Sequence, residues 1–200
     1  MSTFDTRLER LQTIAARVFA EKGYHPTTMR DLARETGMSL AGMYHYVSGK
    51  DELLHSIQRR CFTEVLQGAE AALAEVSDPS ERLERFIRHH ITFFARHMSE
   101  MKVLSHEAES LSGDRLATIN ALKRRYVAML SRLIGDVCDT DECEVDENVA
   151  SYALFGMMNW IYTWYDPAGA VSPQALAGQF TRLFLNGLTA STAAPVTPGG

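Results

Sequence analysis

The sequence lacks the features of a secreted or membrane-embedded protein. Its three cysteines, Cys61, Cys138 and Cys143, are an odd number and too few for a disulfide framework. No apolar run approaches the roughly 18 residues that span a bilayer, and charges occupy the N-terminal segment where a signal peptide has apolar residues. We therefore expect a cytoplasmic protein with no membrane partner.

The sequence also has almost none of the alternating β-branched runs that predict strands. Apolar residues recur instead at spacings of three and four, and glycine, proline and short polar segments separate these stretches. We predict an all-α fold of about nine helices. The expected helices cover about residues 5–22, 29–35, 40–46, 50–76, 80–97, 99–110, 113–137, 147–165 and 173–188.

Charge is distributed unevenly along the chain, although the net charge is only -5. Residues 1–60 hold nine Lys+Arg against seven Asp+Glu, whereas residues 61–200 hold eleven against eighteen. A slightly basic N-terminal part on an acidic remainder indicates that only the N-terminal part meets a polyanion.

The strongest local pattern lies in residues 24–54. Two short helical stretches flank the turn TGMS at 36–39, which has a glycine where a positive φ is common. Thr28 and Ser39 each precede a helical stretch and are suited to cap it. This arrangement is typical of a helix-turn-helix, whose second helix fits the major groove of DNA.

The same segment resembles the DNA-binding domain of the TetR family of bacterial transcriptional regulators. The resemblance covers about residues 8–57 and rests on Phe19, Gly23, Tyr24, TTMRDLA at 27–33, GMS at 37–39, MYHYV at 43–47 and KDELL at 50–54. The run HYV at 45–47 departs from the commoner Tyr-His-Phe but keeps its aromatic character. The resemblance implies a repressor, not an enzyme, that binds a palindromic double-stranded DNA operator as a homodimer and is released by a small molecule.

This resemblance also implies the domain organisation. An N-terminal three-helix helix-turn-helix DNA-binding domain is expected at 1–49, and a C-terminal helical ligand-binding and dimerisation domain at 50–188. The run TASTAAPVTPGG at 189–200 is expected to be a disordered tail.

We expect the DNA contacts to come from the caps, the cations and the second short helix. A lysine at a helix N-terminus opposes the helix dipole, so Lys50 is better explained as a phosphate contact. Arg30 suits a phosphate or a guanine edge, whereas the aromatic residues suit either DNA or packing of the helix. The predicted DNA-binding residues are Thr28, Arg30, Ser39, Leu40, Ala41, Gly42, Tyr44, His45, Tyr46 and Lys50.

One helix-turn-helix contacts few phosphates, so tight binding needs two of them on a two-fold DNA site. Residues 152–162 are apolar on nearly every face, which is typical of a helix buried on all sides. Together with 173–188 they resemble the four-helix dimer interface of the family; an ordinary monomer core is the alternative. The residues expected at the interface are Tyr152, Phe155, Trp160, Leu176, Phe180 and Phe184.

The resemblance places an effector cavity among the middle helices. Nine methionines and several aromatic residues suit an adaptable apolar cavity, although they also suit an ordinary core. Arginines on the middle helices are candidate cations for a phosphate or carboxylate, or else a solvated face. The predicted effector-binding residues are Arg88, Phe93, Phe94, Met98, Met101, Arg125, Tyr126, Met129, Met158, Asn159, Tyr162 and Trp164.

A further run narrows the class of effector. ALFGMMNW at 153–160 and WYDP at 164–167 resemble the TetR subgroup that senses acyl-CoA thioesters in fatty-acid, phenylacetate and steroid catabolism. An arginine usually follows Trp-Tyr in that subgroup, whereas this chain has Asp166. The resemblance implies an acyl-CoA effector and no cofactor.

Two other function classes stay open beside this one. A multidrug-sensing repressor of an efflux pump would bind cations through acidic residues such as Glu100, Glu107 and Glu109. A metal sensor would use the histidines between residues 89 and 106, but their spacing is not that of a zinc site, and we predict no metal. The P-loop, the glycine-rich dinucleotide turn and the Gly-x-Ser-x-Gly elbow of common enzyme classes are missing.

Overall fold

A computed structural model describes residues 3–107, 109–141 and 145–189. Over these residues the chain forms α-helices and one 3-10 helix without strands, which confirms the all-α prediction. The helices are α1 Thr3–Lys22, α2 Met29–Thr36, α3 Leu40–Tyr44, α4 Lys50–Leu73, α5 Pro79–Arg96, α6 Met98–His106, α7 Gly113–Asp141, α8 Glu147–Asn159, η1 Trp160–Thr163 and α9 Pro173–Leu188. Apart from Thr189, the predicted tail lies outside the described residues, as does Cys143.

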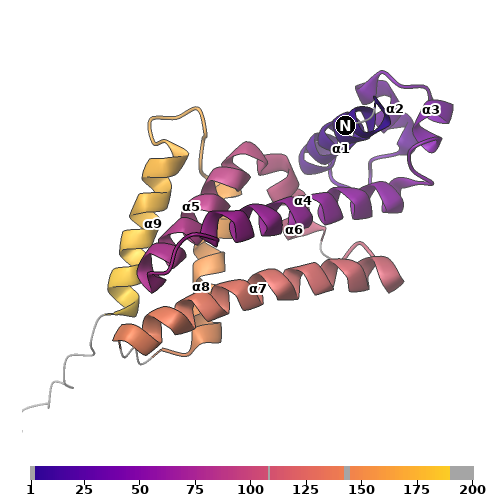
Figure 1. Ribbon diagram of the computed structural model, residues 1–200. Helices are drawn as coiled ribbons and strands as arrows, with labels where there is room; N and C mark the ends of the chain where they lie inside the picture. Colours follow the sequence, from indigo (N-terminus) through magenta and orange to yellow (C-terminus); the bar gives the residue numbers. More distant parts are fainter. Residues whose placement is uncertain (1–2, 108, 142–144, 190–200) are drawn as a thin grey trace, which may run out of the picture.

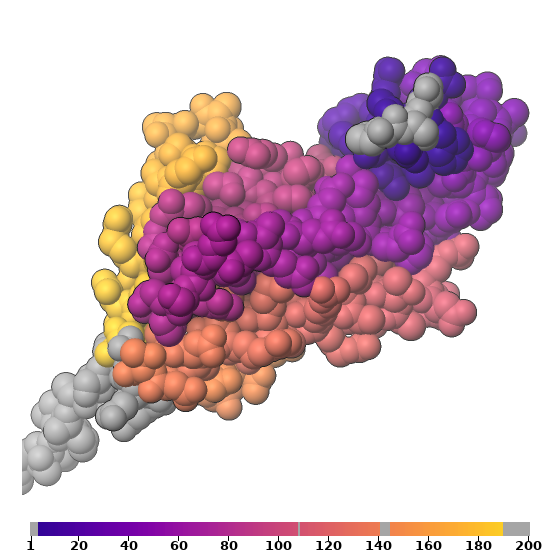
Figure 2. Space-filling view, viewed as in Figure 1, coloured from indigo at the N-terminus to yellow at the C-terminus, as the bar shows by residue number. Residues whose placement is uncertain are grey.

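The molecule is elongated, with α1, α2 and α3 gathered at one end (Figure 1). We call these three helices the head, and we call α5 to α9 the body. Helix α4 begins in the head and runs along the body, where it packs against α5 and α7. The head is a separate lobe in the space-filling view (Figure 2), and its α1 packs against α6 of the body. None of the described helices is long and apolar enough to cross a membrane.

Short polar side chains and prolines begin the helices where the sequence predicts. Asp78 and Ser172 each accept a hydrogen bond from a backbone N–H in the first turn of α5 and α9, and a proline follows each of them. Gly37 ends α2 with φ 69°, a left-handed conformation that favours glycine. Local capping interactions therefore determine where these helices begin or end.

Several helices end earlier than the sequence predicts, among them α3, α4, α6 and α8. Helix α3 stops at Tyr44 because the N–H groups of Tyr46 and Val47 both bond to the carbonyl of Met43, which closes the chain into a turn. Helix α8 stops at Asn159 and continues as η1. There the Trp164 N–H bonds to the carbonyl three residues back, which is the tighter 3-10 pattern.

The core of the body lies between α4, α5, α7 and α8. Phe86 and Ile91 of α5, Ile134 of α7 and Leu154 of α8 are fully buried there. Met158, which the sequence assigns to the effector cavity, is also fully buried. This packing leaves an unfilled space that is lined in part by His90 and Phe94 of α5 and by Leu104 of α6.

Candidate DNA-binding surface and effector cavity

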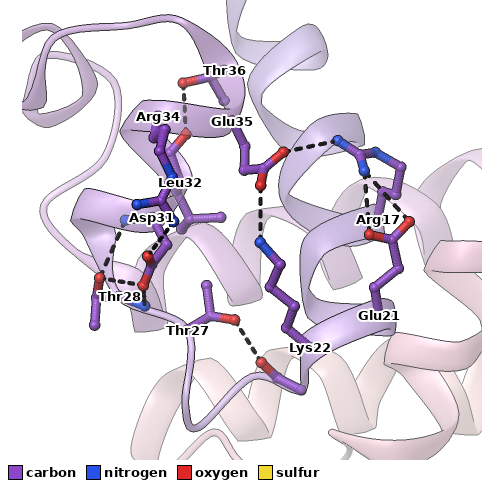
Figure 3. A network of polar contacts seen from close by, with 11 residues as sticks. Arg17, Glu21, Lys22, Thr27, Thr28, Asp31, Leu32, Arg34, Glu35 and Thr36 are labelled. Carbon is purple, nitrogen blue, oxygen red and sulfur yellow. Dashed lines mark hydrogen bonds and ion pairs between the residues drawn. The ribbon is translucent and has the colours of Figure 1, made fainter.

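A capping box fixes the start of α2 in the head (Figure 3). Thr28 Oγ1 accepts a hydrogen bond from the Asp31 N–H, and Asp31 in turn accepts one from the Thr28 N–H at 3.0 Å. The Thr28 hydroxyl also donates to Asp31 Oδ2 at 2.6 Å, and these bonds hold the pKa of Asp31 below its usual value. The hydroxyl of Thr28, which we predicted to be a DNA-binding residue, is therefore engaged within its own helix.

Ion pairs join α1 to α2 within the head (Figure 3). The Glu35 carboxylate accepts from Lys22 Nζ at 2.9 Å and from Arg17 Nη2 at 3.4 Å. The Lys22 contact in particular lowers the pKa of Glu35. Arg30 is exposed and makes no ion pair with a described residue, so its guanidinium is available to an outside partner.

Helix α3 presents a short exposed face that begins at its cap. Ser39 Oγ accepts from the Gly42 N–H at 3.0 Å. A Cβ on Gly42 would lie 3.0 Å from that same oxygen, so glycine leaves room for the cap. Ala41 and Tyr44 are exposed and Leu40 is half-buried, as a face that meets base edges requires.

The aromatic residues after α3 pack against the first turn of α1. The Phe4 ring lies 4.7 Å from the Tyr46 ring and 5.9 Å from the His45 ring, measured between centroids. Arg7 and Arg10 line a surface hollow with these two residues. These arginines were not predicted as DNA-binding residues, although their spacing of three places them on one face of α1.

Lys50 is the first residue of α4, and its side chain binds backbone carbonyls of the head. Its Nζ donates to the carbonyls of Tyr24 at 2.9 Å and His25 at 3.1 Å, and it lies 4.3 Å from the centre of the Tyr24 ring. The Tyr24 hydroxyl donates to Asp51, and burial together with this carboxylate raises its pKa. These backbone carbonyls offset the unfavourable helix dipole, so a phosphate is not required to explain the lysine.

An apolar cavity of about 260 Å³ lies in the body between α4, α5, α6, α7 and α8. Aromatic and aliphatic side chains form most of its wall. Ser105, Tyr152 and Asn159 are exposed and mark its mouth. The lining residues are Phe62, His90, Phe94, Met101, Leu104, Ser105, Lys123, Tyr126, Val127, Tyr152, Phe155 and Asn159.

Some of the predicted effector residues line this cavity and others do not. Phe94, Met101, Tyr126 and Asn159 do, together with two residues that we assigned to the dimer interface, Tyr152 and Phe155. The predicted residues outside its wall are Arg88, Phe93, Met98, Arg125, Met129, Met158, Tyr162 and Trp164.

The two arginines among them are bound at the protein surface. Arg88 pairs with Glu84 one turn earlier on α5, and Arg125 pairs with Glu70 of α4. The cation at the cavity is Lys123, for which no ion pair with a described residue is present. Its Nζ lies 5.9 Å from the centre of the Phe62 ring, and burial lowers its pKa.

His90 is the buried polar residue of the cavity wall. Its Nδ1 lies 3.1 Å from the Tyr126 hydroxyl, whereas its Nε2 has no hydrogen-bond partner among the described residues. Burial lowers its pKa to about 3, with a smaller contribution from His89 in the same direction; the adjacent Asn159 side chain opposes the shift. The imidazole is therefore neutral at physiological pH.

The acidic residues of α6 and of the segment just after it do not line the cavity. Glu100 is buried and pairs with Arg60 of α4 at 3.5 Å. Glu107 accepts from the Ser110 hydroxyl at 2.6 Å. No lining residue carries a carboxylate, and no group of three or more metal-ligating side chains occurs in the part of the chain that the structure describes.

The C-terminal end of α6 connects the cavity wall to the head. Met101 and Leu104 of α6 line the cavity. A few residues later, the Glu107 carbonyl accepts from Gln58 Nε2 of α4 at 3.0 Å. Ser110 Oγ lies 3.3 Å from Nε2 of His25, in the turn between α1 and α2. One short helix thus contacts the cavity, α4 and the head.

Helices α8 and α9, and the 3-10 helix η1 that follows α8, leave large apolar side chains exposed in the single chain. The exposed fraction is 67% for Tyr152, 61% for Trp160 and 67% for Leu183. Of the other predicted interface residues, Phe184 is half-buried, and Phe155, Leu176 and Phe180 are buried within the protomer. The helix that we expected to be buried on all sides therefore has one uncovered face.

Two family descriptions match the chain. One, for bacterial regulatory proteins of the tetR family, matches residues 13–57. The other, for the tetracyclin repressor-like C-terminal domain, matches residues 76–188. The first match takes in the helix-turn-helix, and the second takes in most of the body and its cavity.

Individual relatives agree with these matches over nearly their whole length. The transcriptional repressor KstR2 of Mycolicibacterium smegmatis is 24% identical over 192 residues, which cover 93% of this chain and 92% of KstR2. The crystal structure of AibR in complex with isovaleryl coenzyme A and operator DNA has a TM-score of 0.80 at 28% identity, covering 88% of this chain and 97% of AibR.

A second solved structure is similar to the same extent. The TetR family regulator PfmR from Thermus thermophilus has a TM-score of 0.82 at 32% identity, and the match covers 90% of this chain and 98% of PfmR. KstR2 and PfmR are both named as regulators of transcription. The chain therefore belongs to the TetR family of bacterial regulatory proteins and is a transcriptional repressor of the TetR type, not an enzyme.

Proposed function

We propose that this repressor binds a palindromic operator as a homodimer and releases it when an acyl-CoA thioester enters the body. The observation that carries the choice of effector is the cavity wall, which is apolar, holds one lysine and has no carboxylate. An acyl-CoA needs an apolar space for its acyl group and a cation for its anionic part. AibR, which has the same fold, was crystallised with isovaleryl coenzyme A.

The efflux-pump alternative finds less support in this cavity. A receptor for hydrophobic cations needs an acidic group near the bound charge. Glu100 is committed to Arg60, and Glu107 faces Ser110 and the head. Lys123 at the cavity would repel a cation.

For DNA binding we assign the exposed face of α3 to base edges, and Arg30 to the DNA backbone or a guanine. We add Arg7 and Arg10 as phosphate contacts, because both lie beside the end of α3. The exposed side chains of α8 and α9 supply the dimer contact. We place the boundary between the DNA-binding and ligand-binding domains at residues 49 and 50, where α4 begins.

Release requires that the effector bind the DNA-incompetent state better than the competent one. Helix α6 is placed to carry this difference, since a ligand against Met101 and Leu104 displaces a helix that also holds α4 and the head. A shift of α4 changes the separation of the two heads on DNA.

A thermal unfolding series tests the choice of effector. Acyl-CoA esters, free CoA, free acids and cationic dyes are each added to the purified protein. A ligand at 100 times its dissociation constant stabilises the folded state by roughly 2.7 kcal/mol, which raises the melting temperature measurably. We expect stabilisation by CoA esters and not by free acids. Stabilisation by dyes alone would contradict the proposal.

A further inference from the structure

The cavity contains a polar group that the folded protein leaves without a partner. Nε2 of His90 is buried and has no hydrogen-bond partner of good geometry among the described residues, although the Asn159 side chain lies close to the ring and Nδ1 is held by Tyr126. A buried polar atom without a partner destabilises the folded state. Because His90 lines the cavity, a bound ligand is positioned to supply the missing hydrogen bond.

Tyr126 determines which kind of ligand atom His90 can bind. Its hydroxyl is buried, its pKa is raised well above the usual value, and its only hydrogen-bond partner among the described residues is Nδ1 of His90. The hydroxyl hydrogen is satisfied if it is donated to Nδ1. Since a neutral imidazole carries one hydrogen, Nε2 then carries it and faces the cavity as a donor.

We propose that Nε2–H of His90 donates a hydrogen bond to the carbonyl oxygen of an acyl thioester whose short acyl group fills the cavity. This inference rests on the proposed acyl-CoA function and specifies its ligand. Lys123 and the exposed amide of Asn159 lie at the same cavity and bind the part of the ligand that leaves through the mouth.

The volume of the cavity limits the acyl group. A volume of about 260 Å³ lies just below the range of roughly 300–1,000 Å³ that pockets for small ligands have. We therefore expect a short acyl chain, of about four to six carbons and branched or unbranched, and not a chain of sixteen carbons.

A pair of ligands that differ in one oxygen tests the hydrogen bond. Butyryl-CoA and its thioether analogue S-butyl-CoA have the same chain and the same CoA, but only the first has a carbonyl oxygen. We expect the wild-type protein to bind the thioester roughly tenfold more tightly in a calorimetric titration. Equal affinities would overturn the proposal.

Variants locate this preference at His90. The His90→Leu variant should bind the thioester and the thioether with about equal affinity. The His90→Gln variant has an amide donor and should keep part of the preference for the thioester. Tyr126→Phe removes the hydroxyl that selects the tautomer of His90. This variant should have a smaller preference for the thioester but should still bind both ligands. If His90→Leu keeps the tenfold preference, the assignment of His90 is wrong. Melting temperatures of the variants verify that each is folded.

A chain-length series separates this inference from the function on which it rests. We expect butyryl-CoA and hexanoyl-CoA to bind at least tenfold more tightly than palmitoyl-CoA. Tighter binding of palmitoyl-CoA would overturn the size limit while supporting an acyl-CoA effector. If none of the CoA esters binds, the proposed effector itself is wrong.

Discussion

At the scale of single residues, the head depends on a few side chains that bind backbone groups. Thr28 and Ser39 satisfy N–H groups at the starts of α2 and α3, and Lys50 satisfies two carbonyls of the turn before α2. Each of these helices is short, and a short helix has little stability of its own. The position of the DNA-binding face therefore depends on its caps.

Loss of the α2 cap should destabilise the protein. Thr28→Ala removes the oxygen that accepts from the Asp31 N–H and should lower the free energy of unfolding by about 1 kcal/mol. Denaturant unfolding followed by circular dichroism measures this change. The matched control is Thr28→Ser, which keeps the hydroxyl and should unfold like the wild type. Equal stability of the Ala and Ser variants would contradict the role of the cap.

Arg30 should contribute to DNA affinity through its charge. Arg30→Ala should weaken operator binding and lower the slope of log affinity against log salt by about 1 per protomer, as expected for one lost phosphate contact. Arg124→Ala removes the same charge from an exposed site of the body and is the control. Fluorescence anisotropy over a salt series compares the two. Identical salt slopes for both variants would exclude Arg30 from the interface.

His90 should make stability depend on pH. Its pKa is about 3 in the folded protein and 6.5 without the protein environment, so the unfolded state binds more protons between these values. The free energy of unfolding should therefore fall as pH decreases below about 6.5, by roughly 2 kcal/mol from His90 between pH 7 and pH 5. Urea unfolding at both values, with His90→Leu as reference, isolates this part. The same pH dependence in both proteins would refute it.

At the scale of elements, α6 joins the effector cavity to the head. Its inner face lines the cavity, and the segment just after it contacts His25 and Gln58. At the end of this short helix the Gln58 side chain of α4 donates a hydrogen bond to the Glu107 carbonyl. A small displacement of α6 is therefore transmitted to two elements of the DNA-binding part.

Removal of the His25 contact should weaken the coupling between effector and DNA. His25→Ala should leave effector affinity in the absence of DNA unchanged, because His25 is exposed and does not line the cavity. The factor by which the effector lowers operator affinity should shrink by about threefold. Ser112→Ala, an exposed change in the same connection, is the control. If the effector lowers operator affinity by the same factor in His25→Ala as in the wild type, this contact does not couple the cavity to DNA binding.

Most helices could be predicted from the sequence, because caps and apolar spacing are local properties. The cavity wall could be predicted only in part, since it depends on which side of each helix faces inward. Lys123 lines the cavity and Arg125 does not, although both are cations on α7 two residues apart. His90 was considered only as a metal ligand, because the sequence does not show that its second nitrogen lacks a partner. The end of α8 at Asn159 depends on the 3-10 turn that follows.

At the scale of the whole molecule, the exposed apolar face of α8 and α9 is the feature that a single chain does not explain. Large apolar patches on a monomer mark interaction sites. An operator with two-fold symmetry needs two heads held at a fixed separation. A dimer through this face satisfies both requirements.

A charge placed on that face should dissociate the dimer. Trp160→Glu and Leu183→Glu each bury a carboxylate against an apolar partner surface, which is unfavourable. Light scattering should give the mass of one chain, and operator affinity should fall roughly a hundredfold with the loss of the second head. Ala71→Glu, on an exposed position of α4, should stay dimeric. Dimers of normal affinity in both interface variants would place the interface elsewhere.

An operator-release titration shows whether a ligand in the body controls DNA binding. A palindromic duplex is first selected from a random DNA pool with the purified protein, and butyryl-CoA is then added to the complex. We expect butyryl-CoA to lower operator affinity at least tenfold, which is within the usual range of allosteric coupling, and free CoA at the same concentration to leave it unchanged. Unchanged operator affinity at a concentration of butyryl-CoA that saturates the protein would contradict this control of DNA binding.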